Sequence, residues 1–138
     1  MSQQLLESIT QSQLKTNVPA MAIGDTVVVT FRIVEGDKER TQDFQGVLIS
    51  RSGRGMQEMI VVRKVVDGVG VERIIPLNSP LVAGYEVIRH GDARRAKLYY
   101  LREREGKSQR LRDRRRGMKH VAGSGAIGAP AAPEAPKA

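Results

Sequence analysis

The stretch TVVVTFRIVE, residues 26–35, decides the fold class of this chain. Its apolar side chains occupy every second position and would share one face: Val27, Val29, Phe31 and Ile33. Thr30 and Arg32 fall on the opposite face. Alternation with a period of two is typical of a β-strand that is buried on one side. The stretch therefore predicts a strand in a mainly β protein.

Short β-branched runs between turn residues recur in four further stretches: FQGVLIS (44–50), MIVVRKVV (59–66), VGVERII (69–75) and YEVIR (85–89). Asp67-Gly68 predicts a tight hairpin turn. Gly46 predicts a bulge, where a sheet curves or another backbone comes close. Short strands joined by hairpins favour a small antiparallel barrel or sandwich. Such a barrel has a narrow interior filled by Val, Ile and Leu, which makes it a scaffold and not a ligand cavity.

The two ends of the chain differ from this central part. Near the start, apolar side chains recur at helical spacing, at Leu5, Leu6 and Ile9. With Ser2 as a candidate N-cap, they predict a short amphipathic helix over residues 3–15. A helix this short is marginal alone, so we expect it to dock on another surface. Residues 123–138 are mostly Gly, Ala and Pro and are predicted to be disordered.

The formal net charge of +8 comes from one part of the chain. Residues 94–119 hold twelve Lys or Arg against three acidic side chains, a net of +9, whereas residues 1–93 hold ten against eleven, a net of −1. Neutralising phosphate groups releases their counterions, which favours binding. A polyanion is therefore the natural partner of this block.

Cysteine is absent from the chain, which excludes disulfides and thiolate metal sites and fits a reducing cytosol. No run approaches the roughly 20 apolar residues of a membrane-spanning helix. Neither a signal peptide nor a transit peptide is readable. At 138 residues the chain is long enough for one domain with a real core. We expect a soluble cytoplasmic protein.

The stretch RRAKLYYLRERE, residues 94–105, mixes cations with Leu and Tyr. It fits either a charged, solvated helix or a surface that buries its apolar side chains and grips a polyanion with the others. As a helix it has only a thin apolar stripe, through Leu98 and Leu101. Its aromatic content favours a last strand over residues 97–101, with one Tyr against the core and the other beside cations.

The continuation GKSQRLRDRRRGMK, residues 106–119, favours binding over a merely solvated face. Arg outnumbers Lys there, and guanidinium groups match phosphate oxygens bidentately and stack on bases. Repulsion among these cations opposes compaction until an anion arrives, so this arm is predicted to be partly disordered when free. RSGRG, residues 51–55, is a loop that lets Arg51 and Arg54 approach a phosphate backbone. An ordinary hairpin loop is the alternative.

Catalysis and metal binding have little support in the sequence. His90 and His120 are the only histidines, and without cysteines they make a poor metal site. An acidic cluster near the first hairpin comprises Asp37, Glu39 and Asp43. Surface acids usually serve solubility, and nothing pairs these for acid–base work. GVGVER, residues 68–73, lacks the strand-then-helix setting of a dinucleotide fingerprint. We interpret it as turn plus strand, with Glu72 and Arg73 as a candidate ion pair.

Three stretches together resemble the bacterial large-subunit ribosomal protein L19 family in order and spacing: EGDKERTQDFQGVLISR (35–51), VVRKVVDGVGVERIIPLNSP (61–80) and RRAKLYYLRE (94–103). The resemblance runs from about residue 4 to about residue 116 and is most specific in GVGVER, PLNSP and RRAKLYYLR. It implies an SH3-like barrel preceded by a short helix. It also implies a structural protein without enzymatic activity.

Several partners follow from the resemblance alone. It implies binding to large-subunit ribosomal RNA near the subunit interface and a contribution to an intersubunit bridge that contacts small-subunit ribosomal RNA. The neighbouring large-subunit protein L14 would lie beside this one. A ribosome-bound cytoplasmic protein follows, with no membrane contact, cofactor or small-molecule substrate. The chain departs from the family at Asn78, where relatives commonly have His, and in a longer tail after about Gly117.

The sequence thus predicts a mainly β fold in four parts: an N-terminal helix and linker (1–19), a small SH3-like antiparallel barrel (20–105), a basic C-terminal arm (106–119) and a disordered tail (120–138). The candidate RNA-binding residues are Arg51, Arg54, Arg94, Arg95, Lys97, Arg102, Lys107, Arg110, Arg112, Arg114, Arg115 and Arg116. Two rival functions remain. One is an RNA-binding regulator or chaperone that acts off the ribosome, and the other is a hydrolase that uses the acidic cluster.

Overall fold

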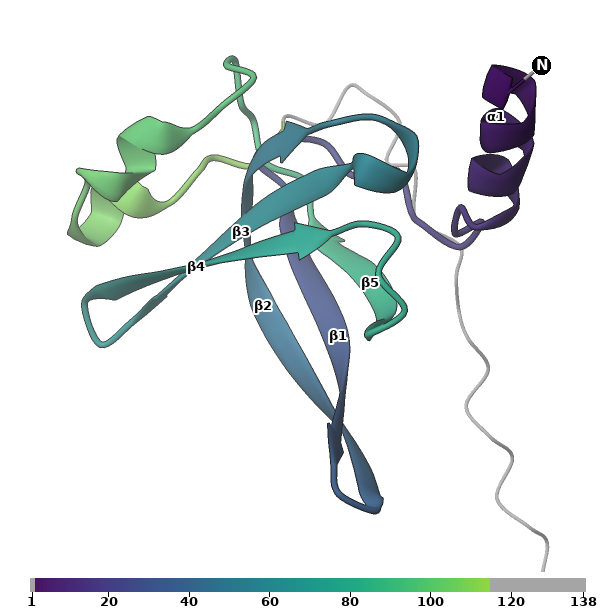
Figure 1. Ribbon diagram of the computed structural model, residues 1–138. Coiled ribbons are helices and arrows are strands. Elements are labelled where there is room, and N and C mark those ends of the chain that lie inside the picture. Colours follow the sequence, from purple (N-terminus) through teal and green to yellow (C-terminus); the bar gives the residue numbers. More distant parts are fainter. Residues whose placement is uncertain (1, 115–138) are drawn as a thin grey trace, which may run out of the picture.

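A computed structural model describes residues 2–114 and contains one five-stranded antiparallel sheet, with strand order β4-β3-β2-β1-β5 (Figure 1). The elements are α1 (Ser2–Ser12), β1 (Thr26–Glu35), β2 (Lys38–Ser52), η1 (Gly55–Gln57), β3 (Met59–Val66), β4 (Val69–Pro76), β5 (Val82–Arg89), η2 (Tyr99–Arg102) and η3 (Gly106–Gln109), where η marks a 3₁₀ helix. The mainly β prediction is confirmed.

Strands β1 and β3 coincide with the predicted stretches, and β4 and β5 extend theirs by one and three residues. The hairpin turn at Asp67 and Gly68 is also confirmed, with φ of 50° and 81°, as a two-residue turn between twisted strands requires. Strand β2 is longer than expected at both ends. The prediction of a loop at Arg51 was therefore wrong, because β2 continues through Ser52 and pairs with β3 there.

Gly46 lies in regular strand pairing, so the predicted bulge at this position was wrong. It pairs opposite Val27 without a register shift, and the shift in β2 falls instead between Leu48 and Ser50. The predicted close approach is confirmed, since a Cβ at Gly46 would lie 2.6 Å from the Arg63 carbonyl oxygen. The residue at the true bulge, Ile49, packs in a different cluster from Leu48.

The sheet curves until both of its edges share one core. Val82 of β5 and Ile75 of β4 pack in the same buried cluster as Val27, Val29, Phe44, Leu48, Ile60 and Val62. Within residues 2–114 no strand pairing joins β4 to β5, so the predicted closed barrel is an open one. Pro76 ends β4 and Pro80 lies in the connection to β5, and neither can donate a backbone hydrogen bond.

Tyr85 spans the opening between β5 and the end of β4. Its hydroxyl donates to the Leu77 carbonyl oxygen at 2.8 Å. Burial disfavours the charged phenolate and raises the pKa of Tyr85 to about 12. The hydroxyl also lies 3.4 Å from the Pro76 carbonyl oxygen, so contacts of one side chain stand where a closed barrel would have a backbone ladder.

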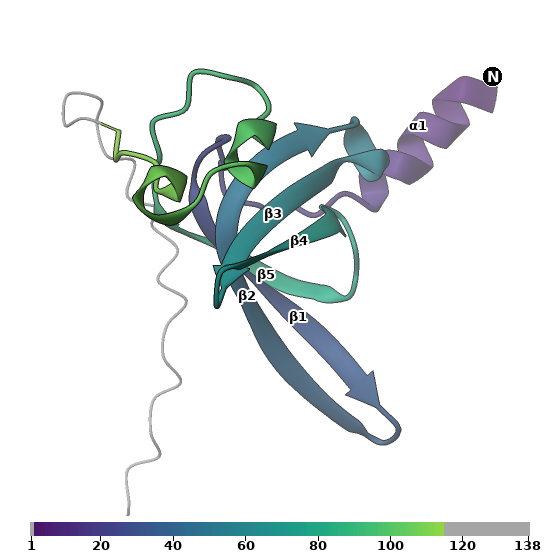
Figure 2. The same ribbon diagram turned by 90° about the vertical axis from the view of Figure 1, so that its left-hand side faces the viewer.

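Helix α1 stands to one side of the sheet in both views (Figures 1 and 2). It ends at Ser12, earlier than predicted, and its apolar residues Leu5, Leu6 and Ile9 are 64%, 62% and 54% exposed. The expected docking of this apolar face is therefore not found within residues 2–114. The helix is nevertheless a single-sided apolar element, as its spacing predicted.

Asn78 connects the linker after α1 to the loop around η1. Its side-chain oxygen accepts from the Lys15 amide at 3.1 Å, and its side-chain nitrogen donates to the Gly55 carbonyl at 2.8 Å. Lys15 also donates its Nζ to the Val82 carbonyl, and burial lowers the pKa of this lysine. Asn78 therefore has an internal structural role.

Candidate nucleic-acid interface

Residues 91–114, called the C-terminal segment below, pack over the sheet through a second, smaller buried cluster. Its buried members are Ile49, Leu98 and Leu101, and Tyr100 and Leu111 pack against them. The Leu98 amide donates to the Ile49 carbonyl at 2.9 Å. The bulge in β2 thus supplies both a side chain and a carbonyl to the segment.

The prediction of a strand over residues 97–101 was wrong, because the stretch forms the 3₁₀ helix η2. Leu98 and Leu101 are three residues apart, which places them on the same side of a 3₁₀ turn. A strand would send them to opposite faces. The stretch therefore forms a 3₁₀ helix because this conformation buries both leucines against Ile49, although aromatic residues favour strands.

Tyr99 and Tyr100 divide as the sequence predicted. Tyr100 packs against the buried cluster, whereas Tyr99 is 41% exposed. Cations lie over both rings, at these distances from the ring centroids: Arg102 4.5 Å and Lys97 5.9 Å for Tyr99, Arg104 4.5 Å and Arg95 5.5 Å for Tyr100. A cation held over a ring keeps its N–H donors directed to other partners. The tyrosines therefore position cations without consuming their hydrogen-bonding capacity.

Arg104 belongs to this group, although the sequence reasoning did not select it. Its guanidinium lies over Tyr100 on the exposed side of the segment, between two acidic neighbours in sequence, Glu103 and Glu105. Neither glutamate has an ion pair with it in the described part of the chain. The signal that would have found it is its spacing of four from an aromatic residue.

Arg102 is bound to the sheet by a two-pronged ion pair with Glu72 of β4. Its Nε and Nη2 lie 2.9 and 2.8 Å from the two carboxylate oxygens, and Arg63 of β3 adds a third contact at 2.9 Å. The hydrogen bond from Arg102 is the main reason why the pKa of Glu72 is lowered, against the effect of burial. The predicted pairing of Glu72 with Arg73 was wrong, because Arg73 lies over the Phe44 ring.

Buried Asp25 anchors the start of the C-terminal segment. Its carboxylate accepts from the amides of Ala22 and Gly91, at 2.9 and 3.2 Å, and lies 3.1 Å from Nδ1 of His90. The side chain is fully buried, and sequence reasoning passed over it because it looks like an ordinary turn residue before β1. His90 thus has a structural partner. No three metal-ligating side chains gather within residues 2–114.

The end of the segment is bound alongside the end of β5. The contacts are Asp92 N to Arg112 O at 2.8 Å, Arg114 N to His90 O at 3.1 Å, Arg89 Nη2 to Leu111 O at 3.0 Å, and an ion pair between Arg89 and Asp113. The sequence predicted a partly disordered arm from residue 106 onward. Through Arg114 the structure instead shows a segment paired with the body of the protein.

The predicted RNA-binding residues fall into two groups. Arg51 and Arg54 lie near η1, and Arg51 is bound to Glu58 and to the Met21 carbonyl. The others that the structure describes lie on the C-terminal segment, which is on the other side of the sheet from η1 in Figure 1. Exposed cations of the segment with no carboxylate partner in the described chain are Arg94, Arg95, Lys97, Arg104, Lys107, Arg110, Arg112 and Arg114. Arg115, Arg116 and the tail lie outside the described residues.

This arrangement presents many exposed cations that have no carboxylate partner within residues 2–114, on a segment that packs against the sheet. No helix in that range is long and apolar enough to cross a membrane. Guanidinium groups in such a setting suit phosphate oxygens. The comparison with protein families finds a match over residues 4–114 to the family described as ribosomal protein L19. The matched range takes in α1, the sheet and the C-terminal segment.

Proposed function

We propose a role at the interface of the two ribosomal subunits for this chain, which belongs to the ribosomal protein L19 family. Membership of the family makes it a structural constituent of the large ribosomal subunit that binds ribosomal RNA, and not an enzyme. The proposal adds which surface of the protein binds the RNA and which two RNA molecules the protein connects. In it, the protein is ribosome-bound in the cytoplasm, and its C-terminal segment is the main RNA-binding surface.

The observation that carries the proposal is the set of exposed cations on the C-terminal segment. Two tyrosines hold four of its cations in place, and among those four only Arg102 is neutralised by a carboxylate within residues 2–114. Phosphate contacts of this kind fix position without reading sequence. They suit A-form RNA, which proteins recognise largely by shape and backbone.

A bridging role is supported by the second basic group near η1. Arg54 is exposed in the loop before η1 and has no carboxylate partner in the described chain. Because this loop and the C-terminal segment lie on different sides of the sheet, they are suited to two RNA surfaces. We propose that large-subunit ribosomal RNA takes the segment and that small-subunit ribosomal RNA approaches the loop. Exposed apolar side chains such as Val69 and Ile74 suit a protein neighbour, for which L14 is our candidate.

Two arginines test the RNA-binding surface. Arg95→Ala removes a cation without a carboxylate partner, so affinity for large-subunit rRNA should fall and the salt slope of binding should decrease by about one. Arg102→Ala removes a cation that Glu72 already neutralises, so its slope should change less. Filter binding of in vitro transcribed rRNA at several KCl concentrations measures both. Equal slopes for wild type and the Arg95 variant would remove that residue from the surface.

Sedimentation separates the proposal from its rival, a regulator or chaperone acting off the ribosome. A ribosomal constituent should sediment with the large subunit at about one copy each after a salt wash, as counted by mass spectrometry. Recovery in the soluble fraction alone would favour the rival. For the bridge, large subunits carrying Arg54→Ala should incorporate the protein normally and associate less with small subunits. Unchanged association would exclude the loop.

A further inference from the structure

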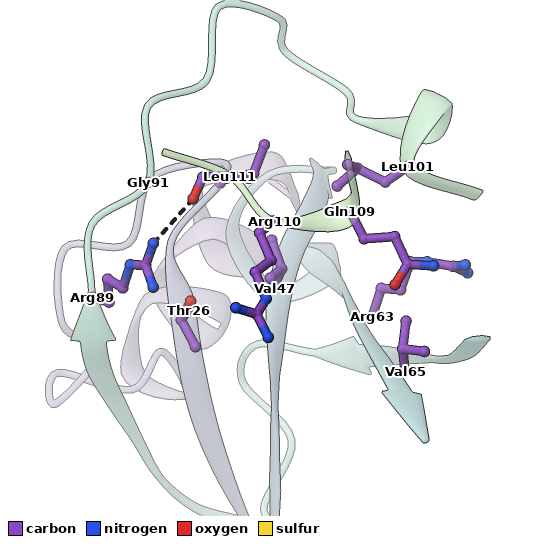
Figure 3. A pocket seen from close by; sticks show the side chains of 11 residues that line it. Thr26, Val47, Arg63, Val65, Arg89, Gly91, Leu101, Gln109, Arg110 and Leu111 are labelled. Atoms are coloured by element: carbon purple, nitrogen blue, oxygen red, sulfur yellow. Dashed lines mark hydrogen bonds between the residues drawn. The ribbon is translucent and has the colours of Figure 1, made fainter. Parts of the chain in front are cut away.

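A groove of about 310 Å³ lies between the C-terminal segment and the sheet (Figure 3). Three arginines from three elements line it together with apolar side chains: Arg63, Arg89, Arg110, Val47, Val65 and Leu101. In Figure 3 the Arg110 guanidinium projects between Arg89 and Arg63. Of these three, the sequence analysis selected only Arg110 for RNA binding.

The charges in this groove do not balance. Arg63 is paired with Glu72, and Arg89 with Asp113. The guanidinium of Arg110 has no hydrogen bond or ion pair within residues 2–114, and no carboxylate is among the residues that line the groove. A partly enclosed space strengthens electrostatic interactions relative to open water. The groove therefore favours an anion beside Arg110.

The shape and lining of the groove narrow the kind of anion. The lining offers guanidinium forks, which suit phosphate oxygens. It also offers apolar surface, from Val47, Val65 and Leu101, which suits the carbon skeleton of a sugar. A volume of about 310 Å³ exceeds what a bare inorganic anion needs and lies at the lower end of the usual range for small-molecule sites.

We propose that this groove receives one nucleotide unit of the bound RNA strand, with its phosphodiester against Arg110 and Arg89 and its ribose against Val65. The inference rests on the proposed RNA binding and deepens it. It adds Arg89 and Arg63 as residues that line a binding site. It also makes the groove a specific binding site for the RNA backbone, whereas the other cations of the segment attract RNA through their charge.

Neighbouring valines on β3 give a matched pair of variants. Val65 lines the groove and Val66 does not, and the two are similarly exposed, at 38% and 42%. Successive strand residues point to opposite faces. Val65→Glu places a carboxylate in the groove, whereas Val66→Glu adds the same charge on the other face. The second variant therefore controls for the long-range effect of one added negative charge.

The experiment measures binding of the full chain to in vitro transcribed large-subunit rRNA over a range of KCl concentrations. Val65→Glu should weaken binding about tenfold and lower the salt slope by about one, whereas Val66→Glu should stay within about twofold of wild type. Equal weakening by the two variants, with wild type binding normally, would overturn the groove proposal alone. Absence of salt-dependent binding by wild type would overturn the proposed function itself.

A second pair keeps the test decisive should Val65→Glu fail to fold. Arg110→Lys and Arg32→Lys preserve charge, but lysine lacks the planar fork. Arg110 lines the groove, whereas Arg32 is exposed on β1, does not line the groove and belongs to neither group of predicted RNA-binding residues. Arg110→Lys should therefore weaken rRNA binding about fivefold or more, and Arg32→Lys about twofold or less. Equal effects would again overturn the groove. Thermal unfolding by circular dichroism checks that each variant is folded.

Discussion

The curved sheet and the C-terminal segment are stabilised in different ways. Every strand contributes side chains to the sheet core, which is built from Val, Ile, Leu, Phe and Met. The segment has one small cluster around Leu98 and Leu101, and its remaining attachments are polar, through Glu72, Asp25 and Asp113. Apolar burial depends little on salt or pH, whereas exposed ion pairs depend on both. The segment should therefore loosen under conditions that leave the sheet intact.

The largest effect on stability should come from truncating a buried side chain in either of the two hydrophobic clusters. Ile60 and Leu98 are both fully buried, so Ile60→Ala and Leu98→Ala should each remove about 2–5 kcal/mol of contacts. The Ile60 variant should lower the free energy of unfolding of the whole protein. The Leu98 variant should release mainly residues 91–114 and weaken rRNA binding. Amide hydrogen exchange distinguishes the two, and equal loss of protection in strands and segment for both variants would show one cooperative unit.

A middle-sized effect should follow from removing the carboxylate that links segment and sheet. Glu72 has its pKa lowered from 4.5 by Arg102, so its contribution to stability is complete above about pH 4.5 and is lost as the pH falls below that value. Glu72→Gln should lower the melting temperature at pH 7 by about 2–4 °C and flatten its fall below pH 4.5. The exposed Glu86→Gln serves as control. A variant with the same acid dependence as wild type would show that the pair contributes nothing.

The smallest effect should be confined to the sheet. Tyr85→Phe removes the hydrogen bond to Leu77 and should cost about 1 kcal/mol. The pKa of Tyr85 is raised from 10.0 to about 12, so its contribution is complete below pH 10 and is lost as the pH rises through 12. Absorbance at alkaline pH should lose its step near pH 12 in this variant. Binding of rRNA should not change, and a change would show that sheet and segment are coupled.

The sheet was predictable because its signal is local. Strand β1 alternates apolar and polar side chains, and Asp67-Gly68 suits only a tight turn, so bounds followed from short windows of sequence. The bulge was misplaced to Gly46 because a glycine within a strand fits a bulge and a close approach equally well. Only the close approach of the β3 backbone to Gly46 shows that the glycine serves the close approach and not a bulge.

The segment was predictable in chemistry but not in geometry. Its charge and residue types pointed to a polyanion, yet its conformation depends on Ile49, almost fifty residues earlier in the chain. Which cations are neutralised depends on similar long-range pairs, such as Arg102 with Glu72. Local propensity favoured a strand there, and tertiary packing overrode it. A sequence read in short windows cannot supply such partners.

The β1–β2 hairpin extends well beyond the core, on the side of the molecule away from η2 and η3 (Figures 1 and 2). Residues 35–43 of this hairpin carry four acidic and two basic side chains, whereas residues 94–114 carry nine basic and three acidic ones. The molecule is thus an electric dipole with its negative pole at the hairpin tip. The electric field of an RNA should rotate the approaching protein, so that the C-terminal segment meets the RNA first. This orienting torque weakens as salt shortens the screening length, and productive encounters should become rarer with it.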